Sequence, residues 1–441
     1  MSERGLDLVG IGFGPSNLAM AIAVAEHNSR PRGAEQGPEG TVAARFLERQ
    51  PEFGWHRGML LEDATMQVSF LKDLVTLRNP TSEFSFLRYL HDRDRLVDFI
   101  NHKTLFPLRV EFHDYFTWAA SQVADQVSYD TEVISVLPVA EDPVENGVIT
   151  AVDVVARSAG AIVTHRARNL VVGTGLRPRM PAGVQQSARV WHSSDLLRNV
   201  DSIRGTEPRR LVVVGAGQSA AEAVAFLHEQ FPSAEVCAVI SRYGYSPADD
   251  SSFANRIFDP DAVDEYFDAP AEVKQAMMAY HGNTNYSVVD IDLIQELYRR
   301  TYREKVLGRE RLRMLNLTRT AAVEENAGSL AVTLQSLVSG ERTVLDADVA
   351  VFATGYDEAD PYAVLGELGD LCLRDAYGRP QVGRDYRALT DPRLRCGIYL
   401  QGGTEHTHGI SSALLSNTAV RVGEVLDSVL HRRAASVLMA A

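Results

Sequence analysis

The chain opens with a short apolar run, a glycine-rich turn and a stretch whose apolar positions follow helical spacing. Residues 6–9 (LDLV) predict a strand and residues 16–27 (SNLAMAIAVAEH) predict a helix. Between them, Gly10, Gly12 and Pro15 stand where a dinucleotide-binding fingerprint has its three glycines. Proline is acceptable in the first turn of a helix, because an N–H group there needs no partner. The pattern therefore predicts a strand, a phosphate-binding turn and a helix.

A second fingerprint with a closer match lies at residues 211–222 (LVVVGAGQSAAE). Gly215, Gly217 and Ala220 follow an apolar strand and precede the helical stretch at 219–231. Helix N–H groups at such a turn face the pyrophosphate of a dinucleotide. The chain is therefore expected to bind two dinucleotides.

The residue that ends the next strand of each unit distinguishes the two dinucleotides. The strand at 44–49 carries Glu48, and an acid there accepts a hydrogen bond from a ribose 2′-OH, as in FAD. The strand at 234–242 ends in Ser241 and Arg242, which suit the 2′-phosphate of NADPH. The alternative for Arg242 is an exposed arginine at a strand end. Residues 28–41 read as an inserted surface loop that lengthens the first interval.

Two strands that end in Thr-Gly turns mark the crossings between the units, at 169–181 and 348–361. The order of the motifs predicts an α/β fold with two Rossmann-like dinucleotide-binding domains, one inserted in the other, and a smaller, mostly helical substrate-binding region. We expect the FAD-binding domain at 1–200 and 346–441, the NADPH-binding domain at 205–250 and 315–345, and the helical substrate-binding region at 250–315.

Composition narrows the possible partners and compartment. The formal net charge of −14 argues against binding to nucleic acid or to an anionic membrane. The first strand begins almost at the N-terminus and no stretch reaches 18 apolar residues, so we expect a cytoplasmic protein. Cys237, Cys372 and Cys396 lie far apart, which predicts buried thiols and neither a metal site nor a dithiol pair.

Several longer motifs, taken together, carry a family resemblance over nearly the whole chain. The two fingerprints and the stretch at 348–361 (DVAVFATGYDEADP) resemble the class B flavin monooxygenases. Four further segments resemble the microbial N-hydroxylating branch, which acts on L-ornithine or L-lysine: 66–90, 249–259, 283–290 and 407–416. The general FxGxxxH signature of flavin monooxygenases survives only as a remnant around His192, for which we expect a structural role.

The resemblance implies the chemistry. NADPH reduces FAD, the reduced flavin takes up O₂ as a C(4a)-hydroperoxide, and the distal oxygen passes to a side-chain amine; no residue is needed as acid or base. The resemblance favours L-ornithine, for hydroxamate siderophore or related peptide synthesis, and implies a homotetramer. L-lysine, one methylene longer, is the alternative. A disulfide reductase lacks its dithiol pair here, and a non-catalytic flavin-binding module is the more distant alternative.

The resemblance also implies the substrate-binding residues. Lys72 matches the partner of the substrate carboxylate, although a lone lysine in an apolar run otherwise reads as a surface residue. Asn255 and Asn285 match the asparagines that bind the amino acid, and without the family each reads as a cap or turn residue. Ser416 is a weaker candidate near the reactive nitrogen.

The remaining predicted site residues divide between the two cofactors. For FAD they are Gly10, Gly12, Gly14, Pro15, Glu48, Trp55, His56, Gln67, Thr354, Gly355 and His408, with Glu405 in the same segment as His408. For NADPH they are Gly215, Gly217, Gln218, Ser219, Arg242 and Asn285.

Overall fold

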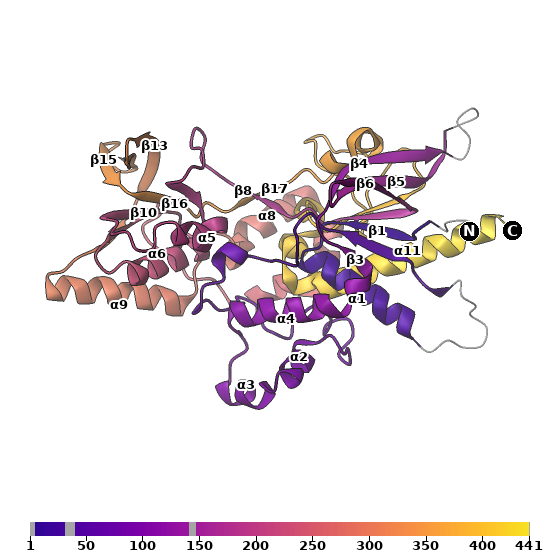
Figure 1. The fold of residues 1–441 in the computed structure, drawn as a ribbon, viewed down its shortest axis with the longest axis horizontal. Helices are drawn as coiled ribbons and strands as arrows, with labels where there is room; N and C mark the ends of the chain where they lie inside the picture. The colour runs from indigo at the N-terminus through magenta and orange to yellow at the C-terminus, as the bar shows by residue number, and fades with distance from the viewer. Residues whose placement is uncertain (1–4, 31–39, 141–146, 441) are drawn as a thin grey trace.

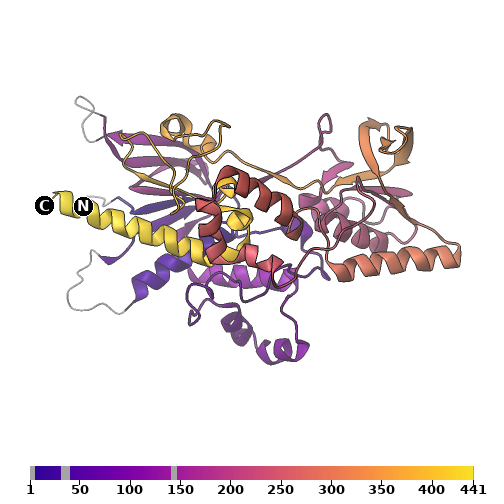
Figure 2. The ribbon, with the colours of Figure 1, turned by 180° about the vertical axis from the view of Figure 1, so that it is seen from behind.

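This computed structural model describes residues 5–30, 40–140 and 147–440. Two α/β units lie side by side along the long axis of the molecule (Figures 1 and 2), and the unit on the right of Figure 1 holds both ends of the described chain. Each unit is built on a parallel five-stranded sheet. Each of the two predicted fingerprints therefore lies in a unit of its own.

The sheet of the first unit has the strand order β18-β7-β1-β2-β3, with every neighbouring pair parallel. Its strands are β1 (Leu8–Ile11), β2 (Ala44–Leu47), β3 (Val127–Ser128), β7 (Asn169–Val172) and β18 (Gly397–Leu400). The strands β1, β7 and β18 are buried along their whole length, as expected for a sheet covered on both faces.

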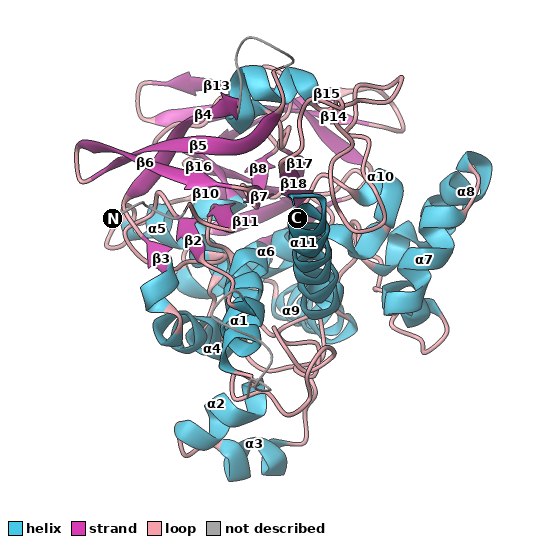
Figure 3. Ribbon diagram, turned by 90° about the vertical axis from the view of Figure 1, so that its right-hand side faces the viewer, coloured by secondary structure: helices cyan, strands magenta, loops and turns pink. Residues whose placement is uncertain are grey.

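Three layers make up the first unit (Figure 3). Helices α1 (Pro15–Ser29), α4 (Arg109–Gln122) and α11 (Thr418–Ala440) cover one face of the parallel sheet, and α11 packs along α1. An antiparallel sheet covers the other face and consists of β4 (Thr131–Ala140), β5 (Ile149–Ser158) and β6 (Ala161–Ala167). The two apolar cores of this unit lie between these layers.

The second unit repeats the design with a sheet of order β12-β11-β10-β16-β9, also parallel throughout. Its strands are β9 (Val190–His192), β10 (Arg210–Val214), β11 (Glu235–Val239), β12 (Leu312–Leu315) and β16 (Val349–Phe352). Helix α6 (Gln218–Gln230) lies in one layer, and an antiparallel sheet of β13 (Thr318–Asn326), β14 (Ser329–Ser336) and β15 (Arg342–Ala347) forms the other.

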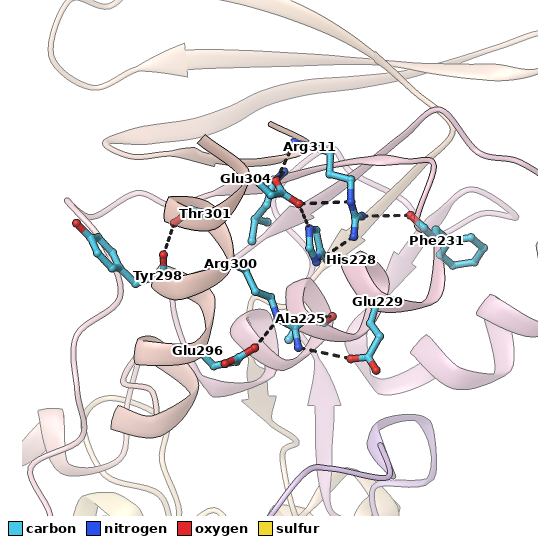
Figure 4. A network of polar contacts seen from close by, with 11 residues as sticks. Ala225, His228, Glu229, Phe231, Glu296, Tyr298, Arg300, Thr301, Glu304 and Arg311 are labelled. Carbon is cyan, nitrogen blue, oxygen red and sulfur yellow. Dashed lines mark hydrogen bonds and ion pairs between the residues drawn. The ribbon is translucent and has the colours of Figure 1, made fainter. Parts of the chain in front are cut away.

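Helix α9 (Ile291–Leu307) is fixed to α6 and β12 by a polar cluster (Figure 4). The carboxylate of Glu304 accepts bonds from the backbone N–H groups of Arg311 and Leu312 and lies 2.6 Å from Nε2 of His228, a buried residue of α6. Arg311 also reaches Nδ1 of His228. This end of α9 therefore belongs to the second unit.

Two chain crossings join the units, and they pair with each other. Strand β8 (Leu176–Pro178) follows the first sheet, and β17 (Tyr356–Glu358) follows the second; they form an antiparallel ribbon between the units, visible near the centre of Figure 1. Arg179 and Asp357 form an ion pair across this ribbon at 2.6 Å.

The predicted domain boundaries need correction at these crossings. Strands β9 and β16 were expected in the FAD-binding domain but pair with each other in the second sheet. β9 follows the first crossing, and β16 precedes the second crossing, so both lie on the side of the second unit. The helical region at 250–315 is also divided. Helix α7 (Pro260–Asp268) packs against α10 (Glu405–His408) of the first unit, whereas α9 and β12 belong to the second. The predicted inserted loop lies mostly outside the described residues.

The remaining elements are short. The other helices are α2 (Phe86–Asp92), α3 (Leu96–His102), α5 (Leu196–Asp201) and α8 (Ala271–His281). The 3-10 turns are η2 (Arg57–Met59), η3 (Ala124–Gln126), η4 (Ser193–Asp195), η5 (Ala254–Phe258), η6 (Gly282–Thr284), η7 (Ala363–Leu371), η8 (Ile410–Ala413) and η9 (Leu415–Asn417). Among the described residues, no helix combines the length and the apolar character needed to cross a membrane. All three cysteines are free thiols and buried, as predicted.

Candidate active site

The first glycine turn lies between β1 and α1, as predicted, and Pro15 is the first helical residue. Pro15 therefore corresponds to Gln218 of the second unit and does not hold the predicted place of the third fingerprint glycine. Gly12 has a φ of +84°, and a Cβ added there would lie 2.4 Å from the carbonyl oxygen of Gly173. The side-chain amide of Asn17 donates to the carbonyl of Gly12 at 2.7 Å and so holds the turn closed. In front of the helix the space is open, because a Cβ added to Gly14 would have no neighbour within 4 Å.

Gly10 has a different role from the one predicted. It lies inside β1, where an added Cβ would approach the ring of buried Phe46 to 2.1 Å. Its missing side chain therefore serves the packing of strand against strand, and the backbone that is open toward a ligand is that of Gly12–Gly14.

Glu48 stands next to this turn, directly after β2. Its carboxylate accepts from the N–H of Phe13 at 2.6 Å and from the N–H of Gln50 at 2.9 Å. The parallel pairing of β1 with β2 brings Glu48 beside the turn although the two lie more than 30 residues apart. An acid in this position can accept a hydrogen bond from a ribose hydroxyl, as the sequence predicts.

The second glycine turn resembles the first on the side that packs against the neighbouring strand. Gly215 has a φ of +153°, and an added Cβ would lie 2.4 Å from the carbonyl oxygen of Ala353. Its front is covered, however, because the Cα of Ser287 would lie 3.4 Å from a Cβ at Gly217. Ser287 itself has a φ of +57°. The segment at 285–290 therefore lies across the turn.

Two predicted NADPH-binding residues are held by this same segment. The guanidinium of Arg242 donates to the carbonyl of Ser287 at 3.0 Å, and the side-chain oxygen of Gln218 accepts from the N–H of Asp290 at 2.8 Å. Arg242 is exposed, so its remaining N–H groups face solvent beside the turn. Ser219 follows Gln218 in the first turn of α6.

The four predicted substrate-binding residues are carried by segments that meet in space. Nζ of Lys72 lies 5.7 Å from the ring centroid of Phe258, which shares the turn η5 with Asn255. Turn η5 packs against η8, and η8 against η9, which carries the buried Ser416. Asn285 precedes Tyr286, whose hydroxyl donates to Glu405 on α10, and α10 packs against η8.

Lys72 lies in a partly apolar environment. Burial lowers the pKa of its ammonium group, and the nearby carboxylate of Asp259 partly offsets this effect by raising the pKa. An anionic ligand would add to the effect of Asp259 and favour the charged form of Lys72 further. Asn255 is fixed for its part, because its side-chain amide donates to the carbonyl of Asp250 at 2.6 Å.

Two of the predicted flavin contacts, Trp55 and His56, lie near the junction of the units. The rings of Trp55 and His56 are 4.6 Å apart, and His56 faces Tyr356 of β17 edge to face at 6.4 Å. His56 has a φ of +50°, which turns the chain sharply at the start of η2. Gln67 is exposed.

The placement of Thr354 and Gly355 corrects the prediction that they belong to the first unit. They follow β16 of the second sheet, where the carbonyl of Gly355 lies 2.9 Å from Nε2 of His192. The sequence motif is similar after both sheets, so local pattern alone does not say which turn faces which cofactor. His192 is fully buried with a partner on each ring nitrogen, which agrees with a structural role.

His408 also differs from its prediction as a flavin contact. It is only 1% exposed and stacks on the ring of Tyr386 at a centroid distance of 4.0 Å. Its ring nitrogens lie within hydrogen-bond distance of Thr407 and of the carbonyl of Arg384. Burial lowers the pKa of His408 to about 4. The ring therefore supports the wall of the site from behind.

Sequence reasoning missed two buried arginines beside the glycine turns. Arg421 on α11 donates to Ser16 at the start of α1 and to Gln401, which directly follows β18. Arg109 at the start of α4 pairs with Glu222 of α6. In the sequence, Arg109 is recognisable only as a single arginine within an apolar run. This pattern indicates a buried cation but does not identify Glu222 as its partner. No cluster of potential metal ligands occurs among the described residues.

Comparison with known proteins identifies the family. A family profile described as L-lysine 6-monooxygenase/L-ornithine 5-monooxygenase matches residues 4–358. The L-ornithine N(5)-monooxygenase of Burkholderia cepacia is 41% identical over 414 residues, which cover 92% of this chain and 90% of that protein. The structure of the ornithine N-hydroxylase of Kutzneria sp. 744 is 50% identical, with a TM-score of 0.92 over 98% of this chain and 100% of that chain.

A relative named for L-lysine has the same fold at lower identity. The crystal structure of L-lysine 6-monooxygenase from Pseudomonas syringae is 31% identical, with a TM-score of 0.82 over 97% of this chain and 99% of that chain. The profile match covers most of the chain. The matched range includes the two glycine turns, the paired crossings and the segments around Lys72. The chain belongs to the L-lysine 6-monooxygenase/L-ornithine 5-monooxygenase family.

Proposed function

We propose that this protein hydroxylates the side-chain amine of L-ornithine, using FAD, NADPH and O₂. The observation that carries the proposal is the position of Lys72, a partly buried cation in the cluster formed by η5, η8 and α10. The Kutzneria ornithine N-hydroxylase was solved with reduced FAD, NADP⁺ and L-ornithine, and it covers nearly the whole of this chain.

The first unit fits FAD. The backbone in front of α1 is open at Gly14, the helix N-terminus favours an anionic pyrophosphate, and Glu48 is available to a ribose hydroxyl. When bound, FAD takes electrons from NADPH and passes one oxygen atom of O₂ to the substrate amine. Trp55 and His56, at the junction, are the side chains that we expect beside its ring.

The second unit fits NADPH. Gly215 lets the backbone approach closely, α6 presents its N-terminus to the pyrophosphate, and the exposed Arg242 can bind the 2′-phosphate. Asn285 lies one residue from Tyr286, which contacts the first unit, and we assign its side chain to the nicotinamide half of the dinucleotide as well as to the substrate.

The task of the protein is to position the amine and exclude water. Lys72 binds the substrate carboxylate, and Asn255 and Asn285 bind the α-amino and carboxylate groups with their amide donors and acceptors. The reacting nitrogen then lies at the opposite end of the amino acid, toward the flavin. Ser416 is buried in η9, which packs against η8, and we assign it to that end of the substrate. In this arrangement the enzyme distinguishes substrates by the length of the amino-acid side chain.

L-ornithine is preferred to L-lysine on the strength of the relatives. The ornithine enzyme from Kutzneria is 50% identical to this chain and the lysine enzyme from Pseudomonas syringae 31%. One methylene changes binding by about 1–3 kcal/mol, which corresponds to roughly 10- to 200-fold in selectivity. Hydroxylamine formation with each amino acid, measured side by side, decides between them.

The decisive test is the Lys72→Ala variant. FAD content and the rate of flavin reduction by NADPH should stay close to those of the parent, because Lys72 contacts neither cofactor in this proposal. Hydroxylated ornithine should fall by about a hundredfold while hydrogen peroxide accounts for the oxygen consumed, since the amine is no longer held in place. Lys305 on α9 is exposed, and the Lys305→Ala variant serves as the matched control, which should behave like the parent.

Two outcomes would reject the assignment of Lys72. Hydroxylation that stays coupled to NADPH oxidation at low ornithine would make Lys72 a surface residue. Loss of flavin reduction itself would place Lys72 in cofactor binding or folding. The cytoplasmic location and the homotetramer stay predictions, for which cell fractionation and light scattering are the measurements.

A further inference from the structure

A buried ion pair joins the two units next to the second glycine turn. Nη1 and Nη2 of Arg109 donate to the two carboxylate oxygens of Glu222 at 2.8 and 2.7 Å. Arg109 is 9% exposed and Glu222 is 5% exposed. Arg109 belongs to α4 of the first unit and Glu222 to α6 of the second, so the pair crosses the boundary between them.

The local sequence does not favour a cation at this place. Arg109 is the first residue of α4, and the N-terminus of a helix carries the positive end of the helix dipole. Burying both charges also removes their hydration, and replacement of such a pair by apolar groups is often neutral or stabilising. Stability alone therefore does not explain the pair. The two parallel contacts between the guanidinium and the carboxylate need another explanation.

The pair is one step in a chain of contacts that ends at the dinucleotide-binding turn. Arg109 also donates at 2.9 Å to the carbonyl of Met59, whose side chain packs in the apolar core of the second unit. Glu222 accepts from the side-chain amide of Gln218 at 2.9 Å, and Gln218 accepts from the N–H of Asp290 at 2.8 Å. Gln218 is the first residue of α6 and Asp290 caps α9.

We infer that Arg109 is a positioning residue for the transfer of electrons between the cofactors. Through Glu222 and Gln218 it fixes the first turn of α6, where the pyrophosphate of NADPH would bind, at a set distance from the flavin-binding unit. The two parallel hydrogen bonds of a guanidinium and a carboxylate define direction as well as distance, which apolar contacts do not. This inference rests on the proposed function, because it needs both cofactors.

The experiment replaces the pair with apolar residues of similar size. In the Arg109→Met/Glu222→Met double variant neither charge is left buried without a partner, so we expect FAD content and the thermal midpoint to stay near those of the parent. Flavin reduction at saturating NADPH, measured anaerobically by stopped flow, should be about ten- to a hundredfold slower, because the nicotinamide is no longer aligned. Reduction by dithionite should be unchanged.

A second variant protects the test against a folding failure. Arg109→Lys keeps the positive charge but cannot form the two-pronged contact, and it should slow reduction by NADPH by about tenfold at full FAD content. Arg166→Met, which removes the exposed two-pronged pair with Asp153 inside the first unit, is the control and should reduce at the parental rate.

A normal rate of flavin reduction in either variant would overturn the inference. If the double variant or Arg109→Lys binds FAD normally and is reduced by NADPH within about twofold of the parental rate, the pair serves only folding. The proposed function is judged separately, since it requires that the parent protein be reduced by NADPH and form hydroxylated ornithine.

Discussion

In both units, a glycine turn at the end of the first strand rests on a carbonyl of the neighbouring Thr-Gly strand. Gly12 meets Gly173 in the first unit and Gly215 meets Ala353 in the second. The fronts of the turns differ. The first is open at Gly14, whereas Ser287 lies over Gly217 and binds Arg242 through its carbonyl. The covering segment is tied to the first unit by the contact of Tyr286 with Glu405.

The difference shows how one fold is adapted to two kinds of ligand. An open turn inside a large covered unit suits a cofactor that stays bound. A turn covered by a segment that contacts both units suits a cofactor that enters and leaves, because binding must displace or accommodate the Ser287 carbonyl at Arg242. Matched changes in the two units should therefore have different consequences, and these range from loss of a cofactor to a small change in stability.

The glycine turns themselves give the largest effect. Gly12→Ala adds a Cβ 2.4 Å from a backbone carbonyl at a φ of +84°, and Gly215→Ala creates the same contact in the second unit. Gly12→Ala should abolish FAD binding, whereas Gly215→Ala should keep FAD and raise the KM for NADPH. Flavin absorbance and NADPH kinetics measure the two effects.

Gly244→Ala is the control for both glycine variants. An added Cβ there would meet nothing within 4 Å, so this variant should bind FAD and NADPH like the parent. Equal loss of flavin in Gly12→Ala and Gly215→Ala would show that the turns do not serve separate cofactors.

Acid should weaken the first unit through His408. Its pKa is about 4 in the folded protein because of burial, compared with 6.5 for an ordinary histidine, so its contribution to stability is complete above about pH 6.5 and declines as the pH falls toward 4. Between pH 7.5 and 5 this amounts to about 2 kcal/mol. His408→Gln should therefore lose less stability than the parent over that range in chemical unfolding experiments.

The second unit supplies the contrasting histidine. Burial also lowers the pKa of His228, but its bond to Glu304 opposes that effect. His228→Gln should change the pH dependence less than His408→Gln does. An identical pH dependence in the parent and in His408→Gln would show that His408 does not remain neutral in the folded protein.

Arg242 tests the chemistry at the front of the second turn. A charge-assisted hydrogen bond contributes roughly 1.5–3 kcal/mol, so Arg242→Ala should raise the KM for NADPH by about ten- to a hundredfold. The KM for NADH should change far less, because NADH has no 2′-phosphate. An equal change for both dinucleotides would assign the phosphate to another group.

The smallest effect on the two cofactors is expected in the cluster of Figure 4. Glu304→Gln weakens the acceptor of two backbone N–H groups and of His228, which should cost about 1–3 kcal/mol in the free energy of unfolding. Glu229→Gln, whose side chain is 60% exposed, is the control and should lie within about 0.5 kcal/mol of the parent. FAD and NADPH binding should be unchanged in both variants.

Local patterns predicted those segments of the site that are contiguous in sequence. The strands and helices around Gly12 and Gly215 follow from apolar periodicity and turn chemistry, which act over a few residues. The contact of Arg109 with Glu222 joins residues 113 positions apart, and no short-range pattern specifies such a pair. The burial of His408 was missed for the same reason, because its wall is built by Tyr386 from another segment.

By itself, the sequence determined the two nucleotide-binding units, their order and the residue types available for an amino-acid substrate. Those features depend on strand and helix periodicity and on motifs held within single segments. Only the tertiary structure decided that β16 belongs to the second sheet, that Ser287 covers Gly217 and that Arg109 joins the units. These contacts are selected by burial and by the satisfaction of charges between distant segments, which only the packed chain brings together.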